Sequence, residues 1–356
     1  MTKPLLLLAL FVALTGCQPS HGNQVDGAQK EVRTMPDLNN VETQLAFTCA
    51  NEKDHLPKLD PQADMLYRYA RWLRKNQIEK EDPRRYPEME RYYRIATAYG
   101  HYKANLDLRE MIRNGQAHSE TPSSEVIDLT QALIKEGIPG SYYDMGLYLQ
   151  KGYGVQQDSE LGLKYMRKAA DLGSPEAQYA VGDMLTKINN PTVYEIGYEL
   201  WKCAAAQGHG QAALFYALTE KELKNYPEAI KYLHLAAKAG DEAGAGRLAD
   251  AFKGPAPENQ LDYLGLEKDE ERSQRYDTIA RILSDYSYAH PKVPELDDIV
   301  PLPPAKLPPW DGKLKWLEEF EANVPPEKPS EALLKQLAQA KGLDPMSGRA
   351  LAKAAQ

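Results

Sequence analysis

The sequence has few of the residue patterns on which enzymes and metal sites are built. Its seven histidines form no His-x-x-x-His or His-Glu-x-x-His pair, and it contains no Gly-x-Ser-x-Gly elbow, Walker loop or dinucleotide-binding fingerprint. Carboxylates are plentiful, but the cluster at 318–321 is typical of a solvated helix surface. We therefore expect no catalytic residues, no metal and no cofactor, and the protein is predicted not to be an enzyme.

Positive charge is also scarce. Lysine and arginine number 43 against 51 acidic residues, so the net charge is −8, and loss of Lys3 with a signal peptide would make it −9. This acidity disfavours nucleic acid as a partner. It would suit a protein with a basic surface.

Long apolar runs are absent apart from residues 5–14, which are too few to cross a membrane. With Lys3 before them and small residues after them, they predict a signal peptide at 1–16. The sequence Leu-Thr-Gly-Cys at 14–17 resembles the bacterial lipobox, which implies a lipid anchor on Cys17. Gln18 then indicates an outer-membrane lipoprotein that faces the periplasm and contacts the membrane only through its lipid. An ordinary signal peptide is the alternative.

Only two cysteines follow Cys17. Residues 17–45, which carry the anchor, are mostly polar and predict a flexible tether. An oxidising periplasm would permit a disulfide between Cys49 and Cys203. The alanine-rich surroundings of Cys203 suit a small buried thiol equally well, so the sequence leaves both states open.

Five glycines recur at nearly constant intervals of 37, 36, 35 and 32 residues. They are Gly100, Gly137, Gly173, Gly208 and Gly240. Self-similarity at a period in the thirties is typical of stacked helical hairpins, and such arrays mostly bind other proteins.

Residues at fixed distances from these glycines also share a size. Nine positions after each glycine the residue is small in four of five cases, with Arg109 the exception. Those eight positions after it are large and apolar: Leu108, Met145, Val181, Tyr216 and Leu248. Such spacings place small and bulky residues together on one helical face, where they pack two helices closely. Each unit is predicted to be a helix A, a turn, a helix B and a glycine stop.

The unit at 141–173 resembles the Sel-one-like repeat, a relative of the tetratricopeptide repeat. Its matching parts are Met145-Gly146, the Gly-x-Gly-Val-x-x-Asp loop at 152–158 and Lys-Ala-Ala at 168–170. The resemblance implies an all-α protein, an α-solenoid of helical hairpins, which we assign to residues 46–254.

The last part of the chain, 255–356, is predicted to be a helical module with a Pro-rich arm at 291–309. The arm is apolar as well as Pro-rich, which favours packing along the solenoid over a free linker. Short helices are expected at 312–323, 330–341 and 345–354. The sequence at 302–312 resembles a module that accompanies these repeats in some bacterial lipoproteins.

If the units stack as in tetratricopeptide arrays, the A helices line the concave face. Positions that avoid the contact between helices A and B then point into the groove and become the candidate partner-binding residues. By spacing these are Tyr67, Arg71, Arg74, Lys103, Arg113, Tyr143, Gln150, Tyr179 and Asp183. An aromatic groove with mixed charge is typical of a protein-binding site.

The repeats, lipobox and C-terminal module together resemble immunity proteins of type VI secretion systems. The resemblance implies a lipoprotein that binds and blocks a toxic effector, such as a phospholipase, in the periplasm. The main alternative is a scaffold in envelope assembly or stress signalling. A cell-wall hydrolase or lipase would need a catalytic constellation that the sequence does not show.

Overall fold

A computed structural model describes residues 46–351, which belong to one compact unit. The expected signal peptide, Cys17 and the tether lie outside these residues. Inside them the chain is helical, with short 3-10 turns and one isolated bridge between Leu343 and Ala350. The all-α prediction is confirmed.

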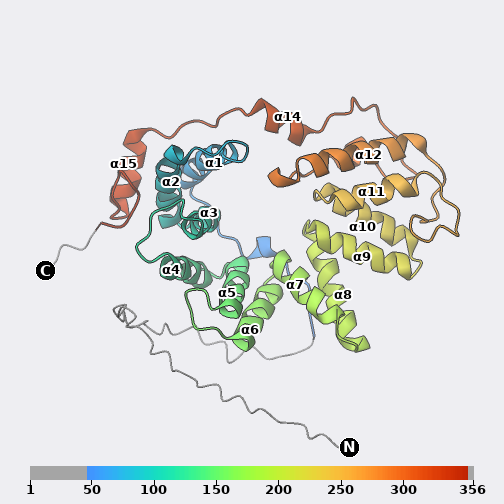
Figure 1. The fold of residues 1–356 in the computed structure, drawn as a ribbon, viewed down its shortest axis with the longest axis horizontal. Helices are drawn as coiled ribbons and strands as arrows, with labels where there is room; N and C mark the ends of the chain where they lie inside the picture. The colour runs from blue at the N-terminus through green and yellow to red at the C-terminus, as the bar shows by residue number, and fades with distance from the viewer. Residues whose placement is uncertain (1–45, 352–356) are drawn as a thin grey trace, which may run out of the picture. The chain divides into compact units, whose positions relative to one another are not determined.

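Consecutive helices of this described part pair as hairpins, and each helix packs mainly against its neighbours in the chain (Figure 1). The pairs are α1 (Pro61–Lys75) with α2 (Tyr86–Ala98), α3 (Tyr102–Arg113) with α4 (Pro122–Lys135), α5 (Pro139–Lys151) with α6 (Ser159–Asp171), α7 (Pro175–Thr186) with α8 (Pro191–Ala206), α9 (Gly210–Glu222) with α10 (Tyr226–Lys238), and α11 (Glu242–Ala251) with α12 (Glu270–Asp285). The predicted solenoid is thus confirmed. Stacking continues through α12, although the repeat pattern in the sequence fades near residue 252.

The remaining elements are short and flank the hairpins. They are η1 (Glu52–Asp54), η2 (Pro83–Arg85), η3 (Ser287–Ala289), α13 (Leu296–Ile299), α14 (Lys315–Ala322) and α15 (Glu331–Ala340).

The repeat glycines end the B helices as predicted. Each stands two residues after the last residue of a helix B, with φ between 74° at Gly100 and 99° at Gly240. This left-handed conformation suits glycine, which has no Cβ to clash with the backbone. The glycine period therefore reports where each hairpin turns into the next.

Small residues let the two helices of a hairpin touch through their backbones. A Cβ on Gly146 of α5 would lie 2.8 Å from the carbonyl oxygen of Gly162 on α6, and one on Gly162 would lie 2.9 Å from that of Gly146. Met145 and Tyr165 beside them are fully buried. Close backbone approach and bulky filling together give the dense packing expected of a core.

The Pro-rich arm packs against the end of the solenoid, as predicted. Val293 and Val300 are fully buried, and the Val293 N–H donates to the carbonyl of Lys238 on α10 at 3.0 Å. Two arginines of α12 donate to carbonyls of the arm: Arg272 to Pro301 at 3.2 Å and Arg275 to Pro308 at 2.7 Å. These bonds satisfy carbonyls that a proline-rich segment cannot pair in regular structure.

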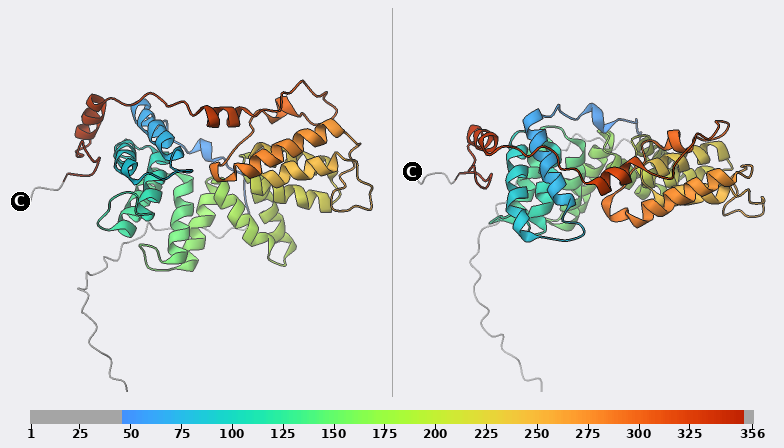
Figure 2. Two further views of the ribbon diagram at one scale, coloured as in Figure 1. Left: turned by 45° about the horizontal axis from the view of Figure 1, so that its top comes forward. Right: turned by 90° about the horizontal axis from the view of Figure 1, so that it is seen from above.

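After the arm, residues 315–349 return to the first hairpin, and we call them the clasp (Figure 2). The Trp72 indole donates to the carbonyl of Asn323 at 3.2 Å, and the Tyr99 hydroxyl donates to that of Leu337 at 3.1 Å. Arg349 of the clasp also pairs with Glu90 of α2, with 2.9 Å between Nε and Oε1. The clasp therefore joins the two ends of the solenoid.

The helices expected at 312–323 and 330–341 form as α14 and α15, but the prediction of a helix at 345–354 is wrong for the described residues up to 351. The Asp344 side chain accepts from the N–H groups of Met346 and Ser347 at 3.2 and 3.1 Å, and Gly348 has φ 72°. A capped turn with a left-handed glycine reverses the chain and leads to the bridge with Leu343.

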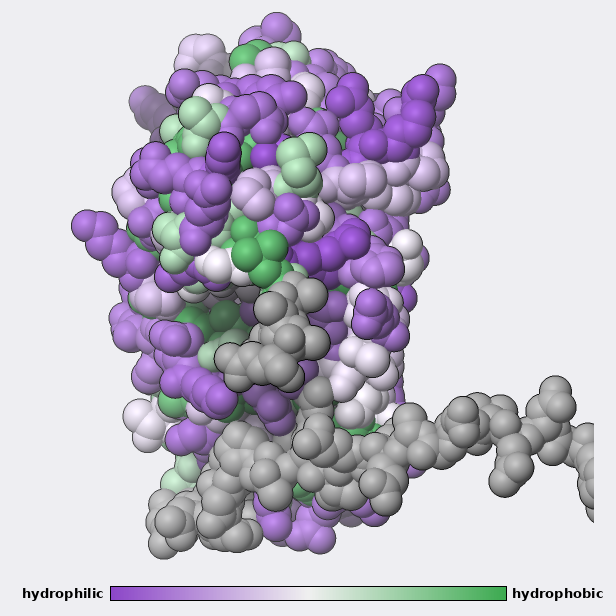
Figure 3. Space-filling model, turned by 90° about the vertical axis from the view of Figure 1, so that its left-hand side faces the viewer, coloured by the Kyte–Doolittle hydropathy of each residue, from purple (hydrophilic) through white to green (hydrophobic). Residues whose placement is uncertain are grey.

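The side of the molecule where α2, α4 and α15 lie carries mostly hydrophilic side chains (Figure 3). Hydrophobic residues on it form small separate patches. This outer side has the character of an ordinary solvated surface.

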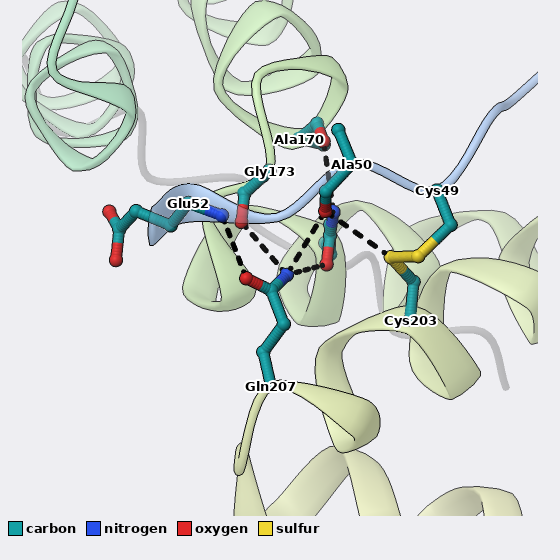
Figure 4. The surroundings of a disulfide bond; sticks show 8 residues. Cys49, Ala50, Glu52, Ala170, Gly173, Cys203 and Gln207 are labelled. Carbon is teal, nitrogen blue, oxygen red and sulfur yellow. Dashed lines mark hydrogen bonds between the residues drawn. A yellow bond between two sulfur atoms is a disulfide. The ribbon is translucent and has the colours of Figure 1, made fainter. Parts of the chain in front are cut away.

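An N-terminal segment, residues 46–56, is irregular apart from η1 and crosses the inner side of the repeats, and we call it the strap (Figure 4). Cys49 of the strap forms a disulfide with Cys203 of α8, with 5.6 Å between the Cα atoms. The carbonyl of Ala50 accepts from the side-chain amides of Gln178 and Gln207, and Gln207 also accepts from the Glu52 N–H at 2.8 Å. The disulfide that the sequence left open is therefore formed.

Gly173 leaves room for the strap. A Cβ at this position would lie 2.5 Å from the carbonyl carbon of Asn51 and 2.7 Å from the Glu52 nitrogen. Gly208, the equivalent glycine of the next unit, has φ 86° and no atom within 4 Å of such a Cβ. Gly173 therefore combines the left-handed turn with close contact to another backbone, as does Gly240, whose Cβ would meet the carbonyl oxygen of Pro291 in the arm.

Replacing both Cys49 and Cys203 by serine should destabilise the protein by about 2–4 kcal/mol, because the disulfide closes a long loop in the unfolded chain. Denaturant unfolding with and without reductant measures this change. Reductant should lower the stability of the natural protein to that of the variant and leave the variant unaffected. Equal stability of the two oxidised proteins would contradict the prediction.

Gly173→Ala should cost more stability than Gly208→Ala. Both substitutions place an alanine in the left-handed region, which costs about 1 kcal/mol. Only Gly173→Ala also forces the strap backbone away, so its unfolding free energy should fall further. Hydrogen exchange of residues 46–56 should rise in Gly173→Ala and not in Gly208→Ala; matching profiles would sink the idea that Gly173 seats the strap.

Candidate partner-binding surface

A charged network joins the inner faces of α1 and α3. Arg74 lies 3.2 Å from Asp107 and 2.7 Å from Glu110, and Arg71 lies 3.5 Å from Asp107. Burial raises the pKa of Asp107, although both arginines oppose that rise. Burial would lower the pKa of Arg74, but Asp107 and Glu110 outweigh it and the pKa is raised. Arg71 keeps half of its side chain exposed at the rim.

Arg109 forms a second, buried network on α3. Its guanidinium donates to Asn105 and Thr130, both at 2.9 Å, and pairs with Asp144 of α5 at 2.8 Å. The sequence marked Arg109 only as the exception to a small position. The structure shows that it is buried and links α3 to α4 and α5.

Two of the predicted tyrosines pack against histidines that cap the next A helix along the chain. Tyr67 lies 4.4 Å from the ring of His101, and Tyr179 lies 4.6 Å from that of His209. Each histidine accepts the N–H of the residue three positions on, which caps α3 or α9. Burial and then Asp107 raise the pKa of Tyr67 to about 12. These tyrosines hold neighbouring hairpins together as well as lining the inner side.

A groove of ≈ 950 Å³ opens between α1 and the clasp. Arg71, Arg74 and Lys75 of α1 line one wall, together with Glu110 of α3. The opposite wall is aromatic and is formed by Tyr288, Trp316 and Phe320. Trp316 and Phe320 stack with their ring centroids 4.9 Å apart, and the Lys75 ammonium lies 4.1 Å from the Phe320 centroid.

The groove brings together Arg71 and Arg74, but not the other predicted residues. Lys103 and Arg113 are exposed on α3, whose Glu110 lines the groove. Tyr143 packs against the core around α6 and α7, and the amide of Gln150 contacts the sulfur of Met166 on α6 at 3.3 Å.

Asp183 of α7 pairs with Lys187, the residue that follows this helix, at 2.6 Å. The aromatic wall escaped sequence reasoning because it comes from residues about 240 positions after α1. The spacing of Trp316 and Phe320, one helical turn apart, was the available signal.

A smaller hollow of ≈ 370 Å³ lies beside the strap, lined by Glu52, Glu176, His209 and Lys292 among others. The carboxyl of Glu52 is partly buried there. Burial, followed by the charge of Glu176, raises its pKa from 4.5 to about 7. Burial also lowers the pKa of His209.

Residues 46–351 contain neither a cluster of metal ligands nor a helix that could span a membrane. No group of three or more histidine, cysteine or acidic side chains there is arranged to hold a metal ion. No helix in that part of the chain has the length and hydrophobicity of a membrane span.

Comparison with known families agrees with the hairpin architecture. The Sel1 repeat matches residues 139–174, 175–209 and 212–241, and a domain of unknown function (DUF6396) matches residues 244–351. The protein is thus a Sel1 repeat protein. No curated protein matches the sequence.

Solved structures identify the family more closely. Immunity protein PA5088 from Pseudomonas aeruginosa is 31% identical, with a TM-score of 0.57 over 72% of this chain and 94% of that chain. PA5086 from the same organism is 30% identical (TM-score 0.55, 72% and 95% covered), and immunity protein Pa5087 is 29% identical (0.55, 73% and 95%). The chain belongs to the family of Sel1 repeat proteins that includes immunity protein PA5088.

Glu52→Gln should stabilise the protein at pH 8 and have little effect near pH 4.5. The folded state holds a proton on Glu52 up to about pH 7, whereas the unfolded chain releases it near 4.5. The contribution of Glu52 to the unfolding free energy is therefore lost as the pH rises from 4.5 to about 7. The variant cannot ionise, so its free energy of unfolding at pH 8 should be higher than that of the natural protein by about 1 kcal/mol after allowance for solvent screening.

Thermal denaturation at pH 4.5 and 8 tests this expectation. Glu258→Gln, which changes an exposed glutamate away from the strap, is the control. A gain that is the same at both pH values, or one shared by the control, would count against the role assigned to Glu52.

Proposed function

We propose that this protein is an immunity protein that binds and neutralises an effector of a type VI secretion system. The observation that carries the proposal is the likeness to immunity proteins PA5088 and Pa5087, at 31% and 29% identity over 94% and 95% of their chains. The likeness extends over nearly the whole length of those chains and so includes the segments outside the repeats. The effector belongs to the class of toxic enzymes that act on the envelope, such as a phospholipase.

The protein acts, in this proposal, as an outer-membrane lipoprotein that faces the periplasm. The disulfide between Cys49 and Cys203 supports an oxidising compartment, where such bonds persist. The lipobox-like sequence that ends at Cys17 supports the lipid anchor, although Cys17 lies outside the described residues. Lipid on Cys17 would keep the protein at the surface where an enzyme of this class attacks.

Neutralisation needs only tight and shape-matched capture of the effector, without chemistry by the immunity protein. The proposed contact residues are the nine inner-side positions predicted from the sequence. Arg71 and Arg74 already line one groove, and Lys103 and Arg113 lie on the helix beside it.

Periplasmic expression of the effector encoded by the neighbouring gene tests the function. Cells that also produce this protein should survive, whereas cells with an empty vector should lose viability. A catalytically inactive effector is the control for general toxicity of export. Equal killing with and without this protein would overturn the proposal.

Affinity capture from solubilised envelopes separates this function from a scaffold. An immunity protein should recover one effector, and only from cells that make it. Recovery of several resident envelope proteins in the absence of the effector would favour the scaffold.

A further inference from the structure

We infer that the effector docks in the groove between α1 and the clasp, and that it presents there an acidic segment with an apolar or aromatic side chain as its anchor. This inference rests on the proposed function and adds where the effector binds and what chemistry it offers.

The groove leaves large apolar side chains in contact with solvent. Ile78, Tyr288 and Val324 line it with 46%, 45% and 76% of their surfaces exposed. Single exposed apolar residues are ordinary, but several around one hollow mark an interaction site. Trp316, stacked on Phe320, gives this hollow a rigid aromatic wall. Aromatic side chains beside arginine are the usual centres of protein interfaces.

The volume of the groove suits a segment of a protein. At ≈ 950 Å³ it exceeds what one side chain fills and matches the upper range of ligand pockets, about 1,000 Å³. A helical turn or a loop with one inserted apolar residue fits such a space.

The lining of the groove is net positive on a protein that is acidic as a whole. It holds three basic side chains, Arg71, Arg74 and Lys75, and two acidic ones, Glu110 and Glu319. Arg71 stands at the rim with 52% of its side chain exposed. Lys103 and Arg113 lie outside the groove lining but are exposed on α3 at spacings of seven and three residues from Glu110, which puts them on the same side of that helix. No carboxylate of residues 46–351 forms an ion pair with either of them. A segment rich in aspartate or glutamate complements this surface.

The strap directs the effector to this end of the inner side. Farther along the solenoid, the strap covers the region where α7 and α8 meet, and its hold includes the Cys49–Cys203 disulfide and the buried Gln178 amide. A partner that used that region would have to displace a covalently attached segment. The inner side at α1 and α3 carries no such cover among the described residues.

Binding of the purified effector to the full chain tests the inference. Arg71→Glu and Val324→Asp change exposed side chains on opposite walls, so both variants should fold, which their thermal denaturation verifies. Each should raise the dissociation constant of the complex with the effector about tenfold or more, because each puts negative charge where an acidic segment docks. Lys253→Glu and Leu223→Asp, at comparably exposed positions elsewhere, are the matched controls and should change it less than about threefold.

Salt dependence tests the acidic character of the docking segment. The affinity of the natural protein should fall as ionic strength rises, and that of Arg71→Glu should fall less steeply. The same slope for both proteins would overturn the acidic segment.

The outcomes separate the inference from the function on which it rests. If the natural protein binds the effector and both groove variants bind equally well, the groove is not the docking site and the immunity function stands. If the natural protein does not bind the effector, both fail. A dimer of the natural protein that Val324→Asp dissociates would instead assign the groove to a second copy of this chain and overturn the inference.

Discussion

Close contact between the paired helices is the constraint on which the whole structure depends. At the crossing of α5 and α6, two glycines bring the backbones together, and any larger residue would separate the helices. The hairpins stack because the short distance between the two helices of each pair gives each hairpin a regular face for the next. Without that spacing, neither the inner side of the solenoid nor the networks that cross it from α1 to α5 would form.

The ends of the chain stabilise the array in different ways. The arm covers the apolar end of the last hairpin, a role that solenoids generally need filled. The clasp then crosses to the first hairpin and contacts it through hydrogen bonds and the Arg349–Glu90 pair. The strap is tied to the middle of the array by a covalent bond. A solenoid is ordinarily held together only between neighbours, and these three segments add contacts between distant units.

The sequence predicted what depends on local pattern and missed what depends on distant pairing. The glycine period located the end of each helix B, because a left-handed residue is a local requirement. The apolar character of the arm predicted that it packs. The clasp could not be foreseen, since the contact between Trp72 and Asn323 joins residues 251 positions apart. Arg109 was visible as an anomaly, yet its partners lie on three helices. Only the wall of the groove on α1 was predicted, through Arg71 and Arg74. The aromatic wall comes from the other end of the sequence and was missed.

The attachment of Cys49 to α8 changes the point at which tension on the N-terminal end enters the folded body. Any pull on the residues before Cys49 reaches the body at Cys203, in the middle of the array, and bypasses α1. In a chain attached only through its first helix, the same pull would enter the array at one end. Because the attachment lies on α8, a load on that end of the chain enters the array there and passes outward from it into both halves of the solenoid.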